Sequence, residues 1–207
     1  MIRSLAVALL FVAMPISAQE AVPAPPPVPV VKAPTVRVDM VTSEGSIVLE
    51  LEKVRAPVTT ANFLKYVDQK RFDGTTFYRA LKLAPDAGLV QGGVGRFPKK
   101  LLPPIAHEPT SRTGLTHDDG AISMARGKPG SAAGDFFITI GALTSLDADA
   151  SKPGDNQGFA VFGHVVEGMD VVNKIVAAPI SPTLGEGAMK GQMILVPVRI
   201  LTVRRGK

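Results

Sequence analysis

The stretch VRVDMVTSEGSIVLEL, residues 36–51, has the pattern of a β-hairpin. Apolar residues occupy every second position from 36 to 40 and again from 47 to 51. This period of two turns one face of each segment toward a core and the other toward water. Between the segments, Ser43, Glu44 and Gly45 supply a turn. The sequence therefore predicts two neighbouring antiparallel strands at the start of the folded domain.

Further strand-like segments follow, separated by glycine-rich turns. They lie at 76–81, 121–125, 135–140, 159–166 and 194–203. A helix is expected over 58–69, because Pro57 suits a first helical turn and apolar residues follow at helical spacing. A second, short helix is expected after Gly168. These elements predict a mostly β protein, an antiparallel barrel whose ends are covered by helices and whose first and last strands pair.

The first residues of the chain are interpreted as targeting and spacer sequence. Residues 1–18 combine Arg3, an apolar run and the small residues Ser17 and Ala18, which is the pattern of a secretory signal peptide. The apolar run is shorter than the ~20 residues of a spanning helix. We therefore expect cleavage near Ala18, export to the periplasm and no stable membrane insertion; an uncleaved anchor is the alternative.

The proline-rich segment that follows predicts an extended spacer. Residues 19–35 contain repeated prolines, which remove backbone donors and favour polyproline geometry. A ligand for a proline-recognising partner is the alternative. Residues 36–207 are then expected to form one domain.

The composition excludes several classes of function. The 207 residues contain no cysteine, which excludes a disulfide scaffold, a thiol nucleophile and a cysteine zinc site. The net charge is +5, but the basic residues are scattered without an aromatic ladder, so we expect no nucleic-acid partner. The histidines, His107, His117 and His164, lack ligand spacing, and Ser123 and Ser145 lack a nucleophile elbow. We therefore expect no metal, no cofactor and no catalytic triad.

Two other motifs are interpreted structurally. The glycine-rich stretch 92–95 lacks the lysine and hydroxyl of a phosphate loop, so we interpret its glycines as turn or bulge residues. Asp147, Asp149 and Asp155 miss the spacing of a calcium loop and are interpreted as part of a solvated loop.

Several short blocks of sequence occur in a characteristic order. They are Phe77-Tyr78-Arg79, Leu89-Val90-Gln91-Gly92-Gly93, Ile122-Ser123-Met124-Ala125, Phe136-Phe137-Ile138 and Val161-Phe162-Gly163. Here the chain resembles the cyclophilins, over roughly residues 36–203. The resemblance implies a peptidyl-prolyl cis-trans isomerase that acts on proline-containing polypeptides. It also implies a closed antiparallel β-barrel of about eight strands capped by two α-helices. We expect a monomer.

The resemblance also implies roles for individual residues. Arg79 matches the catalytic arginine of the family, and Gln91 matches a glutamine that helps to hold the substrate backbone. The residues that match the apolar proline pocket are Leu89, Phe137, Leu146 and Phe159. Ala125 and Arg126 match the backbone that pairs with the bound peptide, with Arg126 in place of the usual asparagine.

This set of residues suits rotation about an X-Pro bond. The barrier to amide rotation is ~18–20 kcal/mol because resonance stabilises the planar forms. In the twisted transition state the prolyl nitrogen regains its lone pair, so a guanidinium nearby binds that state better than either planar form. Taken alone, Arg79 is typical of an exposed arginine, Gln91 of a surface amide and Phe137 of a core ring. The alternation in 136–140 nevertheless lets Phe137 face away from the main core.

The chain departs from the family pattern at several positions. Four additional residues lie within 82–87, and Gly88 stands where the family has a pocket phenylalanine; Leu83 is a candidate to replace that ring. Ser145 replaces an aromatic residue, and Asp135 replaces a glutamine. These departures leave two alternatives to an active isomerase: a low-activity, proline-peptide-binding or chaperone module, and a structural envelope protein that uses its polyproline spacer.

Overall fold

The computed structural model of the chain describes residues 33–206. The signal peptide predicted over 1–18, and all but the last three residues of the spacer predicted over 19–35, lie outside the described residues. Within 33–206, no helix is long and apolar enough to cross a membrane.

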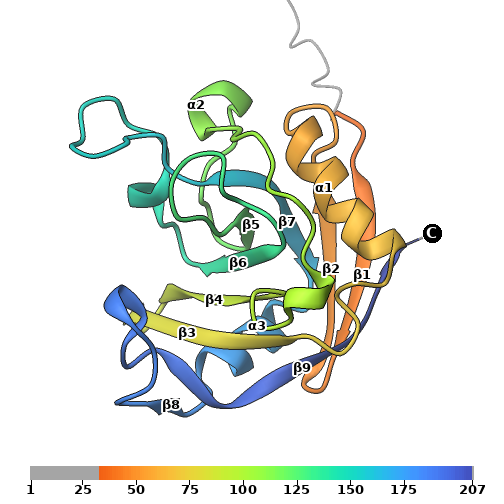
Figure 1. Cartoon of the computed structure of the whole chain (residues 1–207), viewed down its shortest axis with the longest axis vertical. Coiled ribbons are helices and arrows are strands. Elements are labelled where there is room, and N and C mark those ends of the chain that lie inside the picture. Colours follow the sequence, from red (N-terminus) through yellow and green to blue (C-terminus); the bar gives the residue numbers. More distant parts are fainter. Residues whose placement is uncertain (1–32, 207) are drawn as a thin grey trace, which may run out of the picture. The chain divides into compact units, whose positions relative to one another are not determined.

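The described residues form a closed antiparallel β-barrel (Figure 1). In sequence its strands are β1 (Val36–Thr42), β2 (Gly45–Leu51), β3 (Thr76–Ala84), β4 (Ala87–Gly93), β5 (Ala121–Met124), β6 (Asp135–Ile140), β7 (Ala160–Glu167) and β9 (Met193–Arg205). Around the barrel the order is β1-β2-β7-β5-β6-β4-β3-β9, and β9 pairs with β1. The predicted pairing of the first and last strands is thus confirmed. A short additional strand, β8 (Ile180–Ser181), pairs with β9.

The two predicted helices are present and pack against the barrel. Helix α1 (Pro57–Asp68) contacts β7 and β9, and α3 (Met169–Val176) contacts β2, β3 and β4. Each helix buries one apolar face, which includes Phe63 of α1 and Val172 of α3. The expected barrel with two capping helices is therefore confirmed. A third helix, α2 (Thr110–Thr113), and strands β4 and β8 were not among the predicted elements.

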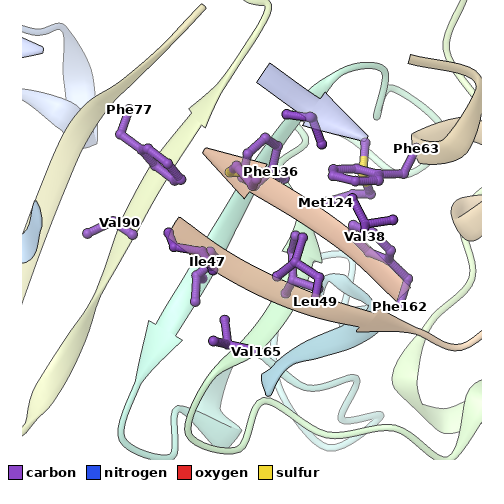
Figure 2. Packing of buried hydrophobic residues seen from close by; sticks show 14 of the residues in the cluster. Val38, Ile47, Leu49, Phe63, Phe77, Val90, Met124, Phe136, Phe162 and Val165 are labelled. Atoms are coloured by element: carbon purple, nitrogen blue, oxygen red, sulfur yellow. The ribbon is translucent and has the colours of Figure 1, made fainter. Parts of the chain in front are cut away.

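The core fills the inside of the barrel. Phe63, Met124, Phe136 and Phe162 come from one helix and three strands and gather there (Figure 2). The rings of Phe63 and Phe136 lie edge to face, with centroids 5.5 Å apart and an interplanar angle of 80°. Such aromatic packing contributes beyond the area it buries. It gives the barrel a rigid wall on which an outer site can be built.

The N-terminus of α1 is capped by a carboxylate from a distant loop. Ala56 precedes the helix and has no side chain that could cap it. Instead Glu108, only 1% exposed, accepts hydrogen bonds from the backbone N–H groups of Val58 (3.2 Å) and Thr59 (2.7 Å). A negative charge here also suits the helix dipole. Glu108 therefore fixes α1 to the loop that precedes β5.

Candidate active site

A row of paired residues crosses the outer face of the barrel. Arg79 of β3 pairs with Gln91 of β4, Gln91 pairs with Phe137 of β6, and Phe137 pairs with Ser123 of β5. Directly paired residues of neighbouring strands project to the same face. Because Val90 and Phe136, which neighbour Gln91 and Phe137 in sequence, belong to the core, this row faces away from the core. The register thus brings Arg79, Gln91 and Phe137 together.

A β-bulge adds Tyr78 to the same face. The register of β3 shifts between Phe77 and Arg79 against both β4 and β9. An extra residue at such a position re-aims the side chains that follow it. Phe77 and Ala80 point into the core, whereas the two residues between them, Tyr78 and Arg79, both line an outer cavity. The bulge therefore places a phenol and a guanidinium side by side.

The cavity has a volume of about 650 Å³ and a mostly apolar lining. Its apolar lining includes Leu81, Leu89, Ala125, Phe137, Leu146 and Phe159. Leu89 and Phe137 belong to a small apolar cluster that is separate from the main core. The rings of Phe137 and Phe159 stand edge to face, 5.4 Å apart at 87°, and form a corner. All the residues that were predicted for the proline pocket line this cavity.

Arg79 is held at the cavity by two amide oxygens. Its Nη1 donates to Oε1 of Gln91 at 2.7 Å, and its Nε donates to Oε1 of Gln192 at 2.8 Å. Gln192 is anchored in turn by a bond from its Nε2 to the carbonyl of Ala188. Partial burial lowers the pKa of the Arg79 guanidinium, but an arginine stays protonated at any physiological pH. The site therefore holds a fixed positive charge beside an apolar corner.

A second set of polar contacts continues from Gln91. Its Nε2 donates to the hydroxyl of Tyr78 at 2.7 Å, and that hydroxyl donates to Oδ2 of Asp135 at 3.0 Å. Burial and the neighbouring Asp135 carboxylate raise the pKa of the Tyr78 hydroxyl. Burial also raises the pKa of Asp135 itself, against the lowering effect of the hydrogen bonds that it accepts. The hydroxyl therefore stays protonated and remains a donor at neutral pH.

A buried histidine supports Phe137 from behind. His117 is fully buried and stacks on the Phe137 ring with centroids 5.7 Å apart and an angle of 8°. Its Nδ1 lies 2.6 Å from Oδ1 of Asp147, and its Nε2 lies 3.0 Å from Oγ of Ser123. Burial lowers the pKa of His117, although the bond to Asp147 opposes this effect. The ring is therefore neutral, donating to Asp147 and accepting from Ser123.

This trio corrects one interpretation of the sequence. Asp147 does not belong to a merely solvated loop, because its carboxylate holds the buried His117. Nothing in the sequence indicated that Ser123, His117 and Asp147 are hydrogen-bonded to one another, as they are in the structure. Ser123 is fully buried, so no substrate reaches its hydroxyl. These three hydrogen-bonded side chains stabilise the wall of the cavity and are not arranged for nucleophilic catalysis.

Arg126 folds back over the apolar corner. Its guanidinium lies over the Phe159 ring, 5.1 Å from the centroid, and pairs with both carboxylate oxygens of Asp155 at 2.8 and 2.9 Å. Its Nε and Nη2 also donate to the carbonyl of Gly158. The pair with Arg126 lowers the pKa of Asp155 to about 2. Asp155 lies in an exposed loop, as expected from the sequence, and its carboxylate also fixes a side chain of the site.

The additional residues within 82–87 and Gly88 lie outside the lining of the cavity. The additional residues lengthen the β3–β4 hairpin, whose last pair is Ala84 with Ala87. Leu83 is 59% exposed and lies outside the cavity lining, so it does not replace the missing ring; Leu81 lines the cavity instead. A Cβ at Gly88 would lie 2.4 Å from the Leu81 carbonyl oxygen, so this position excludes larger residues.

Sequence reasoning missed three residues of the site. Gln192 and Tyr78 were not singled out, and His117 was set aside because it lacks ligand spacing. Gln192 lies 113 residues from the arginine that it holds, and no local pattern marks that contact. His117 precedes Ser123 by only six residues, but its carboxylate partner lies 30 residues further on.

Comparisons with known proteins agree with this architecture. Residues 37–204 match the family model described as cyclophilin type peptidyl-prolyl cis-trans isomerase/CLD. A peptidyl-prolyl cis-trans isomerase of Streptomyces antibioticus is 37% identical over 164 residues, which cover 77% of this chain and 94% of the relative. A peptidyl-prolyl cis-trans isomerase of Acinetobacter baylyi is 36% identical over 171 residues, 81% of this chain and 84% of the relative.

A solved structure shares the fold. The crystal structure of a cyclophilin type peptidyl-prolyl cis-trans isomerase from Cryptosporidium parvum superimposes with a TM-score of 0.66. The match covers 84% of this chain and 98% of that one, at 20% sequence identity.

Proposed function

Because the chain belongs to the cyclophilin-type peptidyl-prolyl cis-trans isomerases, we propose that Arg79 carries out the isomerisation of X-Pro bonds by stabilising the twisted amide. The observation that carries this proposal is the position of Arg79. Its guanidinium is fixed by Gln91 and Gln192 at a cavity that is also lined by the apolar corner of Phe137 and Phe159.

In this mechanism the apolar corner holds the proline ring. Contact with Leu89, Leu146 and the two phenylalanine rings orients the pyrrolidine so that its nitrogen faces the guanidinium. As the amide twists, the nitrogen becomes pyramidal and regains a lone pair, which accepts a hydrogen bond from Arg79. Because this interaction is stronger in the twisted state than in either planar state, it lowers the barrier. The forward and reverse rotations cross the same barrier, so both are accelerated.

The substrate backbone is held by the segment that directly follows β5, at Ala125 and Arg126. The N–H of Ala125 already donates to the carbonyl of Asp135, 2.9 Å away. Pairing with an extended peptide therefore falls to the carbonyl of Ala125 and the N–H of Arg126. The side chain of Arg126 is engaged with Phe159 and Asp155, so it supports the wall of the cavity. With the peptide fixed on one side of the proline, only the other side rotates.

A proline-limited peptide assay tests the role of Arg79. The change Arg79→Ala is expected to lower kcat/KM about 100-fold, which is typical of removing one preorganised donor from a site where charge develops. Lys82→Ala, which removes an exposed cation from the same strand, is the control and leaves kcat/KM unchanged. Equal kcat/KM for Arg79→Ala and the wild type would exclude the proposed mechanism.

We also propose that the substrates are exported polypeptides and that the mature protein is a periplasmic monomer. The support is the sequence of residues 1–18, with its positive start, apolar run and small residues before Gln19, followed by the spacer over 19–35. Mass spectrometry of the protein recovered from a periplasmic fraction is expected to show an N-terminus at Gln19. Recovery of the uncleaved chain with the membranes would contradict this localisation.

A further inference from the structure

A continuous hydrogen-bond relay joins Arg79 to the loop that follows β4. Arg79 donates to Gln91 at 2.7 Å, Gln91 donates to Tyr78 at 2.7 Å, and Tyr78 donates to Asp135 at 3.0 Å. The relay ends where Oδ1 of Asp135 accepts the backbone N–H of Gly95 at 2.7 Å. The guanidinium is therefore connected, through two side chains, to a carboxylate on another strand.

The two ends of the relay determine its direction. A guanidinium only donates hydrogen bonds, so Gln91 must present its oxygen to Arg79 and its amide hydrogens to Tyr78. An ionised carboxylate only accepts, so the hydroxyl hydrogen of Tyr78 must point to Asp135. Every member of the relay then has a partner of the correct type. The amide of Gln91 has one allowed orientation as long as Asp135 is ionised.

The glycine-rich stretch 92–95 surrounds the carboxylate of Asp135. The backbone N–H of Gly95 donates to Oδ1 of this carboxylate, and the neighbouring backbone of Val94 also favours its ionised form. A Cβ at Gly93 would lie 2.6 Å from its Oδ1, and a Cβ at Gly95 would lie 2.2 Å from its Oδ2, so only glycine fits at either position. These glycines, interpreted from sequence as turn or bulge residues, form an anion cradle that is occupied by a side chain of the same protein.

We propose that Asp135 and Tyr78 are positioning residues that orient Arg79 for catalysis through Gln91. This inference rests on the proposed role of Arg79 in isomerisation. The ionised carboxylate fixes the hydroxyl of Tyr78, the hydroxyl fixes the Gln91 amide, and the amide oxygen fixes the guanidinium. A small displacement of a catalytic group is enough to cost a large factor in rate, so the state of Asp135 controls turnover although it lies two side chains from the guanidinium.

A proton on Asp135 breaks the relay. One carboxylate oxygen faces the backbone N–H of Gly95, so the proton must occupy the oxygen that faces Tyr78. The tyrosine hydroxyl then accepts from Asp135 and turns its own hydrogen toward Gln91. The Gln91 amide turns over to accept it and sets its N–H groups against the guanidinium, so Arg79 is less firmly held. Isomerisation is therefore expected to slow at acid pH.

The surroundings of Asp135 raise the pH at which this loss of rate begins. Burial raises the pKa of Asp135 above that of an ordinary carboxyl group. The titratable or charged groups that face it are Tyr78 and, one contact further, Arg79 of β3, together with Tyr66 of α1. Burial, and to a smaller extent the charge of Asp135, raises the pKa of Tyr66, so both tyrosines stay neutral in this range. The proton that breaks the relay is therefore the one on Asp135.

The test uses two variants of the relay and two matched controls. Asp135→Asn keeps the shape of the side chain but cannot ionise, and Tyr78→Phe removes only the hydroxyl. Asp86→Asn makes the same change on the exposed tip of the β3–β4 hairpin, and Tyr66→Phe removes a hydroxyl that binds the Leu102 amide and lies outside the relay. For each protein, NMR exchange spectroscopy on an Ala-Pro peptide gives the cis/trans exchange rate of the bound peptide, and a shift titration gives its Kd.

We expect both relay variants to slow the bound exchange about tenfold at neutral pH, with Kd changed less than about threefold. In the wild type and both controls the exchange rate of the bound peptide falls as the pH is lowered. In the relay variants this rate does not depend on pH in the same range. In the Tyr78→Phe background, Asp135→Asn has no further effect, because the relay is already broken. The proposal is overturned if Asp135→Asn matches Asp86→Asn at every pH, or if the relay effects multiply in the double variant.

Tyr78→Phe keeps the ring and the carboxylate cradle, so it supplies the test even if Asp135→Asn fails to fold. Arg79→Ala, measured in the same experiment, separates this inference from the function on which it rests. If Arg79→Ala slows the bound exchange but the relay variants behave as their controls, only the relay is wrong. If Arg79→Ala exchanges at the wild-type rate, the proposed role of Arg79 is itself wrong.

Discussion

Removal of the Phe137 ring is expected to weaken substrate binding without changing the chemical step. The ring is 3% exposed, lines the cavity, stacks on His117 and stands at a right angle to the Phe159 ring. Its remaining surface is therefore the part available to a proline ring. Burying a whole side chain of this size is worth about 1.5–3 kcal/mol, and most of this ring is already covered in the free protein, so we expect Kd to rise about tenfold.

The bound exchange rate is expected to stay within about threefold of the wild type in Phe137→Ala. The ring contacts the planar and twisted forms of the substrate alike, so its loss removes uniform binding and leaves the barrier between bound states unchanged. A shift titration with an X-Pro peptide measures Kd, and exchange spectroscopy at saturating protein measures the bound rate.

Leu143→Ala is the matched control. Leu143 is 7% exposed and belongs to the same small cluster as Phe137, but it does not line the cavity. Both changes are expected to lower the free energy of unfolding by about 2–4 kcal/mol, which a domain of this size tolerates. Only Phe137→Ala is expected to raise Kd. A similar rise in Kd for the control, or a large fall in the bound exchange rate for Phe137→Ala, would refute the reasoning.

Two further predictions concern stability. Glu108→Ala leaves the first N–H groups of α1 without their acceptor and is expected to lower the free energy of unfolding by about 1–3 kcal/mol in urea denaturation; an unchanged midpoint would contradict the capping role. Burial lowers the pKa of His117, so the unfolded chain binds its proton more readily and the protein loses stability as the pH falls below about 6.5. Between pH 5 and pH 8 the melting temperature of His117→Gln should depend less steeply on pH than that of the wild type. The same pH dependence in both proteins would exclude His117 as the cause of the acid destabilisation.

The strand pattern could be predicted from sequence wherever apolar and polar residues alternate. The hairpin at 36–51 is one case, because its alternating apolar residues Val38, Met40, Ile47, Leu49 and Leu51 are the ones that belong to the core. Strand β4 escaped prediction because its sequence ends in Gly92-Gly93 and resembles a turn. In the structure a Cβ at Gly92 would lie 2.8 Å from the Thr76 carbonyl oxygen, so the glycine permits close strand contact. Glycine there reflects packing, not a chain reversal.

The site could be predicted from sequence only in part. The resemblance identified Arg79, Gln91 and the apolar lining, all of which lie at one cavity. The bulge at Tyr78 has no local signature, since it arises from the register of β3 against two neighbouring strands. The contacts that hold the site, such as Arg79 with Gln192 and His117 with Asp147, join residues far apart in sequence. Such partners become visible only once the barrel is closed.

The role of Arg79 is tested most directly by the exchange rate of a peptide that is already bound. With Arg79→Ala at saturating concentration, we expect cis/trans exchange of the bound X-Pro bond to slow about 100-fold while Kd changes less than about threefold. That result would mean that the guanidinium stabilises the twisted amide more than the planar forms. A bound exchange rate equal to that of the wild type, with the whole effect in Kd, would show that Arg79 only helps to hold the peptide.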